Sequence, residues 1–300
     1  MAQYNRALGY EAATALPALT ALDACAPVDA LLEELRTEGG LVLKGALKQS
    51  DVKRLQTEHR RLLQRIAPAF ADLQNREHKP PTCAAPDLDS DESFYKGEVQ
   101  FDQESTRPLR LRKTAQGRFD LKSLDKRDCG PFLRQEFPDL PFFIDQVLLP
   151  PIVRTLLQRS MGTPWRVMRV GSLPTLPGAT VGDVRETQAC LSHMLLLLAK
   201  GPLNVLLQWH RDIGEGLFGE SFDLQLPDYY FNALIPLDPT SNENGTELVL
   251  RSHTTTTKEL SSCRRAVAAA QLGDVIFCER RLSCLLPASQ NRAADFMFSA

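Results

Sequence analysis

The sequence predicts a mainly β fold, an antiparallel barrel or sandwich, with helices on its N-terminal side. Two observations support this prediction. The first half of the chain has apolar residues at helical spacing, and the second half has short β-like runs separated by turn residues, without long helices between them. These runs lie at 204–209, 229–237, 247–250, 275–278 and 296–298.

The N-terminal half begins with a predicted helix, a strand and a second helix. Leucines recur at helical spacing over 28–37, and two glycines end that pattern before the apolar run 41–43. Ser50 is a good N-cap for a long helix that runs to residue 66 with one apolar stripe. His59 lies in that helix, where we expect a surface or helix-packing residue and not a metal ligand.

The composition changes twice between the helices and the β half. Residues 77–107 are rich in Pro, Asp, Glu, Ser and Gln, which is typical of a mobile loop. Helical spacing returns over 142–149 and 152–160, and 165–170 has the pattern of a strand. We therefore expect a single domain over 1–300, with a helical part to about residue 160 and a β core from about residue 165.

The composition also limits the partners of the protein. The 300 residues carry a net charge of -2, which gives no basic field for nucleic acid, and 43% are hydrophobic, which is ample for a large core. The start of the chain lacks the pattern of a secretory signal, and the most apolar run is too short to span a bilayer. Seven cysteines without a CxxC pair are typical of reduced thiols. We expect a cytoplasmic protein that binds neither nucleic acid nor membranes.

One strand end carries a candidate metal-binding pair. His210 and Asp212 follow the apolar run 204–209, and residues two apart on an extended chain point to the same face. An imidazole and a carboxylate side by side are two of the three ligands in the two-histidine, one-carboxylate set of non-haem Fe(II) oxygenases. The pair alone is a weak signal, because such spacing recurs by chance. The third ligand must come from elsewhere in the chain.

Segments downstream of this pair extend the pattern. They read ENGTELV at 243–249, RSH at 251–253 and GDVIF at 273–277. In their order and separation, they resemble the phytanoyl-CoA dioxygenase family of Fe(II)/2-oxoglutarate oxygenases, especially the fungal members that tailor terpenoid and other secondary metabolites. The resemblance implies a double-stranded β-helix (a jelly-roll or cupin-like core) flanked by N-terminal helices. It also implies Fe(II) and 2-oxoglutarate as cofactors.

The resemblance further implies roles for single residues. His210 and Asp212 match the first two metal ligands of the family, and Thr246 falls near a family hydroxyl that helps to hold 2-oxoglutarate. The Asn-Gly pair just before Thr246 is equally typical of a tight turn. His253 matches a histidine that is structural in the family, so we assign it no metal role.

The chain departs from the family pattern at the remaining site positions. Cys284 stands where the second metal histidine is expected, and no histidine follows His253. A family arginine pairs with the distal carboxylate of 2-oxoglutarate, and here the nearest candidate, Arg292, comes too early in the chain. An insertion near 180–203 precedes the HxD strand. The Cys284 thiol could bind a metal, but it is softer than imidazole and easily oxidised, and the alternative is a small buried hydrophobe.

The loss of a ligand and of the arginine predicts a family member that is itself non-catalytic. We expect it to act in the oxidative tailoring of a small lipophilic, terpenoid-like metabolite, as the partner of an active homologue in a heterodimer. The apolar run 195–198 is a candidate interface, or alternatively a core helix.

Two other functions stay open. The first is an active Fe(II)/2-oxoglutarate-dependent hydroxylase or desaturase, with an atypical metal site that Cys284 or water completes. The second is a cupin-like protein that holds another divalent metal such as zinc, which rests on the HxD pair alone.

Overall fold

The structure is a computed structural model. It describes residues 16–75, 94–100, 106–115, 118–123, 149–162, 165, 169–175, 222, 224–242, 245–256, 259, 262–279, 281–285 and 293–299.

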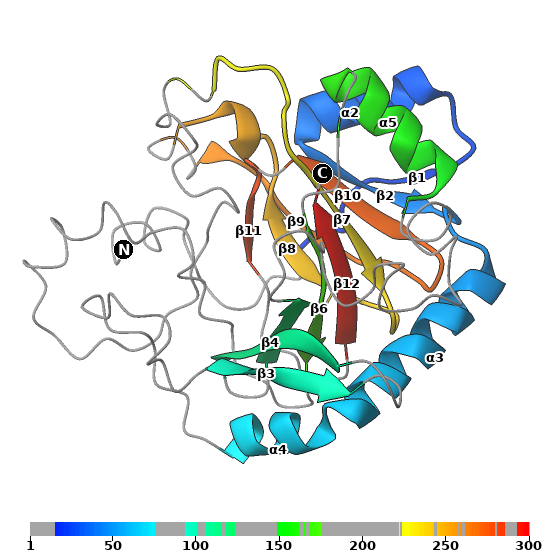
Figure 1. Cartoon of the computed structure of the whole chain (residues 1–300). Coiled ribbons are helices and arrows are strands. Elements are labelled where there is room, and N and C mark those ends of the chain that lie inside the picture. Colours follow the sequence, from blue (N-terminus) through cyan, green and yellow to red (C-terminus); the bar gives the residue numbers. More distant parts are fainter. Residues whose placement is uncertain are drawn as a thin grey trace, which may run out of the picture.

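A nine-stranded mixed sheet forms the centre of the described structure (Figure 1). Every neighbouring pair is antiparallel except β1 and β2, which are parallel. In spatial order the strands are β1 (Ala21–Asp23), β2 (Gly40–Lys44), β10 (Val275–Glu279), β7 (Phe231–Pro236), β12 (Ala293–Ser299), β6 (Arg169–Thr175), β5 (Arg118–Ser123), β4 (Thr106–Ala115) and β3 (Phe94–Gln100).

A smaller antiparallel sheet and the four α-helices of the described residues cover this large sheet. The small sheet has the order β11 (Ser283–Leu285), β8 (Thr246–Val249) and β9 (Arg265–Ala268). The α-helices are α2 (Val28–Glu38), α3 (Gln49–Arg65), α4 (Ala67–Asn75) and α5 (Pro151–Met161), and a short 3-10 helix, η3 (Ser252–Thr254), follows β8. The helices lie on one side of the large sheet and the small sheet lies on the other (Figure 1).

Successive side chains of the central strands point to opposite faces of the sheet and contribute to two separate hydrophobic cores. In β10, Val275 and Phe277 pack towards the helices, whereas Ile276 and Cys278 pack towards the small sheet. Strands β2 and β7 alternate in the same way, because successive side chains of a strand point to opposite faces. The sequence of these strands is therefore apolar on both faces, as expected for a sheet that is covered on both sides.

The core on the helix side joins the large sheet to all four helices. Phe231 of β7 stacks on Phe277 of β10, with ring centroids 5.2 Å apart. The helices contribute the residues of their apolar stripes to this core: Leu31, Leu32, Leu35, Val52, Leu55, Leu73, Val153, Leu156 and Leu157. The other core is smaller and lies between the two sheets: Leu19, Val42, Leu234, Leu248, Leu250, Ala266, Ala268, Ala270, Ile276, Cys278 and Leu282.

An N-terminal segment connects the two sheets before the first helix. The backbone of Leu19 donates to Val267 of β9 at 2.7 Å, and Val267 donates to Pro17 at 2.9 Å. Only a few residues later the chain enters β1, which pairs with β2 of the large sheet. Residues 17–23 therefore close one side of the two-sheet core by hydrogen bonding to both sheets.

The structure confirms the coarse prediction of a β-rich core flanked by helices and corrects several details. Ser50 is not an N-cap, because α3 begins one residue earlier, at Gln49. The predicted strand at 165–170 is displaced along the chain, since β6 runs from Arg169 through Pro174 to Thr175. The predicted helix at 142–149 falls almost wholly outside the described residues, and the predicted strand at 204–209 lies outside them entirely.

The predicted mobile loop over 77–107 is wrong at 94–100 and 106–107, and the rest of it lies outside the described residues. Residues Phe94–Gln100 form β3, which pairs antiparallel with β4 from Thr106 onwards. The loop was inferred from polar and charged composition, but an antiparallel strand at the edge of a sheet tolerates such residues because one face can meet water. β3 and β4 form a hairpin whose paired residues run from Gln100 with Thr106 to Phe94 with Arg112, and composition does not reveal this pairing.

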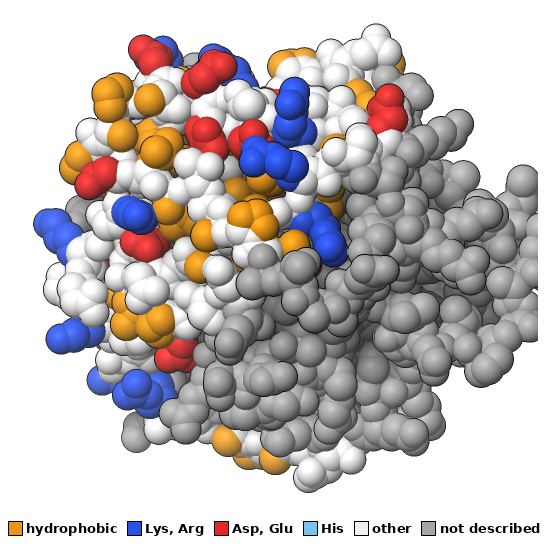
Figure 2. Space-filling view, turned by 180° about the vertical axis from the view of Figure 1, so that it is seen from behind, with side chains coloured by type: hydrophobic (Ala, Val, Ile, Leu, Met, Phe, Trp, Pro, Cys, Tyr) orange, Lys and Arg blue, Asp and Glu red, His pale blue; other side chains and the backbone are white. Residues whose placement is uncertain are grey.

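Charged side chains are mixed on the described surface. In Figure 2 acidic and basic groups alternate with apolar ones over the part of this face that is described, without a large patch of one charge. Among the described residues, no helix is long and apolar enough to cross a membrane.

Gly39 ends α2 in a conformation that an L side chain rarely adopts. Its φ is +85°, and its N–H donates to Leu35 O at 2.8 Å as a helix C-cap. A Cβ placed here would lie 2.4 Å from Nδ1 of His253 and 2.6 Å from Leu282. The glycine therefore permits both the turn and the close approach of η3 to the helix end.

Gly39→Ala is expected to lower the free energy of unfolding by more than the ~1–2 kcal/mol of left-handed backbone strain. The matched control is Gly45→Ala, since Gly45 has φ +65° but a Cβ added there would meet nothing within 4 Å. Urea unfolding of both variants measures the difference, which reports the steric contact with His253. Equal losses would contradict the close packing of this corner.

Candidate functional site

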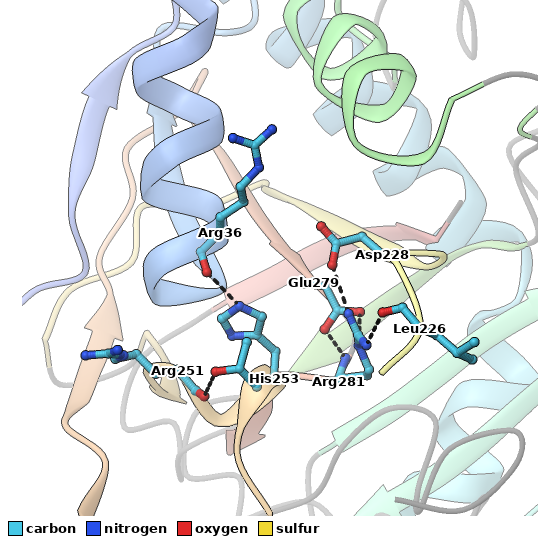
Figure 3. A network of polar contacts seen from close by, with 8 residues as sticks. Arg36, Leu226, Asp228, Arg251, His253, Glu279 and Arg281 are labelled. Carbon is cyan, nitrogen blue, oxygen red and sulfur yellow. Dashed lines mark hydrogen bonds and ion pairs between the residues drawn. The ribbon is translucent and has the colours of Figure 1, made fainter. Parts of the chain in front are cut away.

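A buried charged cluster lies where β10 ends and β7 begins (Figure 3). We call it the Arg281 cluster, formed by Leu226, Asp228, Tyr229, Glu279 and Arg281. Glu279 is the last residue of β10 and pairs across the sheet with the first residue of β7. Arg281 lies in the turn that leads from β10 into β11, so the cluster joins both sheets and the segment before β7.

The Arg281 guanidinium uses all of its nitrogens within the cluster. Nε donates to Glu279 Oε1 at 2.9 Å, Nη2 donates to Asp228 Oδ1 at 2.8 Å, and Nη1 donates to the Leu226 carbonyl at 3.2 Å. Its Cζ lies 5.6 Å from the centre of the Tyr229 ring. The planar fork of arginine suits this geometry, because each N–H has a fixed direction.

Glu279 accepts two hydrogen bonds in a place that excludes water. Besides Nε of Arg281, the backbone N–H of Arg281 donates to Glu279 Oε2 at 2.8 Å. Only 1% of the Glu279 side chain and 6% of the Arg281 side chain are exposed, whereas 26% of the Asp228 side chain is exposed. One cation thus lies between a fully buried carboxylate and a partly exposed one.

Burial raises the pKa of Glu279 to about 7. The nearby Arg281 charge and its hydrogen bonds act in the opposite direction, and the Asp228 charge adds to the rise. Loss of hydration is the largest cause, so Glu279 changes its charge near neutral pH. Perturbed carboxyl groups of this kind occur in functional sites and also in structural ion-pair networks.

His253 binds the end of α2 beside this cluster (Figure 3). Its Nε2 lies 3.0 Å from the Arg36 carbonyl, and only 3% of the residue is exposed. Neighbouring backbone contacts strengthen the junction, since Arg251 N–H donates to the Glu38 carbonyl at 2.9 Å. His253 thus satisfies one of the carbonyls that a helix end leaves without an intrahelical partner.

The Gly-Asp pair of the family-like segment also has a structural role here. Gly273 has φ +99°, and the buried Asp274 accepts hydrogen bonds from the backbone N–H groups of Gly45 at 3.0 Å and Gln271 at 2.8 Å. These bonds fix the turn that starts β10 and tie it to the end of β2. The pair therefore sets the position of the strand that carries Glu279.

The structure describes only two of the five residues predicted for the metal and cofactor site. His210, Asp212 and Arg292 lie outside the described residues. Thr246 is the first residue of β8 and is buried, and its backbone pairs with Ala268. Cys284 is the middle residue of β11 and its backbone pairs with Leu248 of β8. Among the described residues, no group of three or more His, Cys, Asp or Glu side chains could hold a metal ion.

Sequence reasoning missed the Arg281 cluster. The signal was present, because Glu279, Arg280 and Arg281 follow an apolar strand, and charged residues at such a position are exposed or paired. Asp228 lies more than fifty residues earlier in the chain, and only the fold reveals that it is the partner of Arg281.

His59 is a second buried titratable group, on the helix side of the large sheet. Its Nε2 lies 3.2 Å from Ser172 Oγ of β6, so it packs α3 against the sheet as expected for a helix-packing residue. Burial lowers the pKa of His59 to about 4.

Comparisons with known proteins show likeness in fold alone. No family model matches the chain, and no curated protein matches its sequence. The solved structure of EvdMO1 has a TM-score of 0.50 and 16% identity; the match covers 91% of this chain and 49% of that one, so this chain spans about half the length of EvdMO1.

Two structures of SnoN also match. SnoN is described as a non-heme alpha ketoglutarate dependent epimerase from nogalamycin biosynthesis. The match has 13% identity and a TM-score of 0.49 and covers 91% of this chain and 82% of that one. Its complex with Fe3+, alpha ketoglutarate and nogalamycin RO matches at 12% identity, with the same TM-score and coverage.

Arg281→Met is expected to lower the free energy of unfolding by about 3–5 kcal/mol, because it leaves the buried Glu279 carboxyl without its cation. The control is Arg159→Met, whose partner Asp29 is 85% exposed, so a change within about 1 kcal/mol is expected. Chemical denaturation at constant pH measures both. Similar losses in the two variants would show that burial does not distinguish these ion pairs.

His59 and Glu279 are expected to give opposite slopes of stability against pH. The pKa of His59 is lowered in the folded state. Its contribution to the free energy of unfolding is therefore complete above the unfolded pKa of 6.5 and is lost as the pH falls towards 4. The pKa of Glu279 is raised, so its contribution is complete below the unfolded value of 4.5 and is lost as pH rises through 7.

The two contributions can be separated with single variants. Relative to the wild type, His59→Gln should lose stability more as pH rises towards 6.5, and Glu279→Gln should gain relative stability as pH rises from 4.5 to 7. Unfolding free energies measured across this range supply the difference curves. A flat difference curve for either variant would refute the assignment of that residue.

Proposed function

We propose that the chain is an oxygenase-like jelly-roll protein that does not hold iron and 2-oxoglutarate efficiently by itself. We further propose that it acts as the partner of a catalytically active homologue in the oxidative tailoring of a small lipophilic metabolite. The observation that carries this proposal is the position of Cys284 on β11, in a strand order that supports a double-stranded β-helix.

The strand order supports the jelly-roll assignment. In an eight-stranded jelly roll, the first, eighth, third and sixth strands form one sheet, and the second, seventh, fourth and fifth form the other. Strands β6, β12, β7 and β10 follow the first order within the large sheet, and β11, β8 and β9 follow the last three positions of the second. None of the described strands takes the remaining, second position, and 204–209, where the sequence predicts a strand, lies outside the described residues.

This assignment puts Cys284 on the seventh strand, where the resemblance places the second metal histidine. The donor set of the chain then consists of one imidazole, one carboxylate and a thiol. A thiol is a softer ligand than imidazole and is oxidised easily beside activated oxygen. These residues do not fit the ligand set that the family uses for Fe(II).

The 2-oxoglutarate site departs from the family as well. The family arginine is expected in the region of β12, the eighth strand, and the seven residues of this strand, Ala293–Ser299, include none. Arg292 comes directly before the strand. A missing arginine removes the bidentate partner of the distal carboxylate, so the chain loses affinity for the keto acid as well as for the metal.

A role in association follows from the proposed weak binding of both cofactors. A stable jelly roll that lacks its own catalysis can stabilise an active homologue or complete its substrate pocket. Co-expression with a paralogue tests this part: a stable heterodimer with higher activity than the paralogue alone is expected. If each chain is soluble and fully active alone, the partner role is refuted.

The metal site is tested by adding Fe(II) and 2-oxoglutarate to the purified chain without oxygen. The weak charge-transfer band of an Fe(II)-keto acid complex should be absent in the wild type at millimolar 2-oxoglutarate. Cys284→His restores the imidazole, so Mn(II) binding followed by electron paramagnetic resonance should tighten by at least about tenfold, or ~1.4 kcal/mol. The control is Cys263→His, which adds a histidine to the loop before β9 and should leave Mn(II) affinity unchanged.

Two outcomes would count against the proposal. A charge-transfer band and brisk turnover of 2-oxoglutarate by the wild-type chain alone would establish the alternative, an active oxygenase with an atypical site. Equal Mn(II) affinity in Cys284→His and in the wild type would show that Cys284 does not occupy the third ligand position.

A further inference from the structure

We propose that Glu279 and Asp228 compete for the single guanidinium of Arg281, so that ionisation of Glu279 releases Asp228 and loosens the attachment of residues 226–230 to the β10–β11 turn. This pH-responsive contact is independent of the proposed oxygenase-like function, because it depends only on the Arg281 cluster. Failure of one proposal therefore leaves the other intact.

The geometry determines which carboxylate can leave. Glu279 is fixed at the end of a central strand, accepts two N–H groups, and has a side chain that is only 1% exposed. Asp228 has one bond to Arg281 and a side chain that is 26% exposed. Water can solvate Asp228 after release at little cost, whereas release of Glu279 would leave a buried charge unsolvated.

The charge balance gives the direction of the switch. When Glu279 is protonated, the positive Arg281 and the negative Asp228 balance each other. When Glu279 is ionised, two carboxylates share one cation and the cluster carries a net negative charge. Repulsion between the two carboxylates then favours movement of the more exposed one into water.

Among the described residues, the other elements that pack against Glu279 supply no second cation at the cluster. The backbone of Glu279 donates to the Gly39 carbonyl at 2.8 Å, and the first residue of β7 opposite it is Phe231. Arg281 and Asp228 are the charged groups that act on the Glu279 carboxyl. The remaining titratable neighbours in the cluster and at the helix end are Tyr229, under the guanidinium, and His253, which binds the Arg36 carbonyl.

Residues 226–230 have two attachments to Arg281 that would respond. These are the Asp228 carboxylate and the Leu226 carbonyl, and the Tyr229 ring lies beside the same guanidinium. The segment continues directly into β7, so its attachment sets how firmly the start of that central strand is held. Protonation of one buried carboxyl is thereby coupled to the mobility of this end of the core.

The test is a pH titration of the whole chain by two-dimensional NMR. The Arg281 amide reports the ionisation of Glu279, because it donates to Glu279 Oε2. The Asp228 and Tyr229 amides report release of the segment. Both sets of signals should change together with one midpoint near pH 7, and lose this transition in Glu279→Gln.

A second variant tests the competition directly and alters only a partly exposed side chain. Asp228→Asn removes the competing charge, so the midpoint of the Arg281 amide should move down by about one pH unit, the order expected for one nearby like charge. By linkage, ionisation of Glu279 should favour release of Asp228 by the same factor, about tenfold for one unit. The control is Glu58→Gln, which breaks the α3 ion pair with Arg61 and should leave the transition unchanged.

Three results would overturn the proposal. One is a wild-type segment whose signals do not change between about pH 6 and pH 8, the range around the ionisation of Glu279. Another is a transition that persists in Glu279→Gln. The third is an unchanged midpoint in Asp228→Asn, which would show that the two carboxylates do not compete and that Arg281 serves both as a static contact.

Discussion

Burial of both faces of β2, β7 and β10 is the constraint on which the rest of the structure depends. The helix side of these strands packs on α2, α3 and α5, and the other side packs on the small sheet. A strand that is covered on both faces cannot slip by one residue without exchanging the contents of the two cores. The register of these three strands therefore fixes the ends at which the polar groups lie.

Junctions at the edges hold this layered arrangement together. The N-terminal residues 17–23 hydrogen bond to both sheets, and the end of α2 is tied to η3 through His253 and Gly39. Asp274 similarly ties the start of β10 to Gly45. Each junction satisfies backbone groups where regular secondary structure stops, and burial makes such satisfaction necessary.

The Arg281 cluster is the place where this hydrophobic scaffold accommodates charge. It stabilises the turn between β10 and β11, three residues before Cys284, and the segment that enters β7. A buried carboxyl beside a cation shared with a second carboxylate is sensitive to pH, whereas an all-apolar turn would not be. The cluster therefore connects the chemistry of single side chains to the positioning of two strands at one end of the core.

The sequence by itself determined α2, α3, α5 and the central strands. Periodicity located α2, α5, β2 and β10 to within two residues, because each has a strong apolar pattern that its burial demands. The resemblance also implied that His253 is structural, and in the structure His253 contacts the Arg36 carbonyl at the end of α2. The spacing of apolar residues was sufficient to predict an element wherever its buried residues recur at the period of a helix or a strand.

Only the tertiary structure decided the pairing of distant, polar segments. The edge strand β3 has a polar and charged composition that suggested a loop, and α3 begins one residue before the N-cap that the sequence suggested. Arg281 contacts Asp228, 53 residues earlier in the chain, through the order of the strands, whereas Glu279 is only 2 residues away. Such contacts depend on which strand ends lie close together in the fold, and a local sequence pattern does not encode that distance.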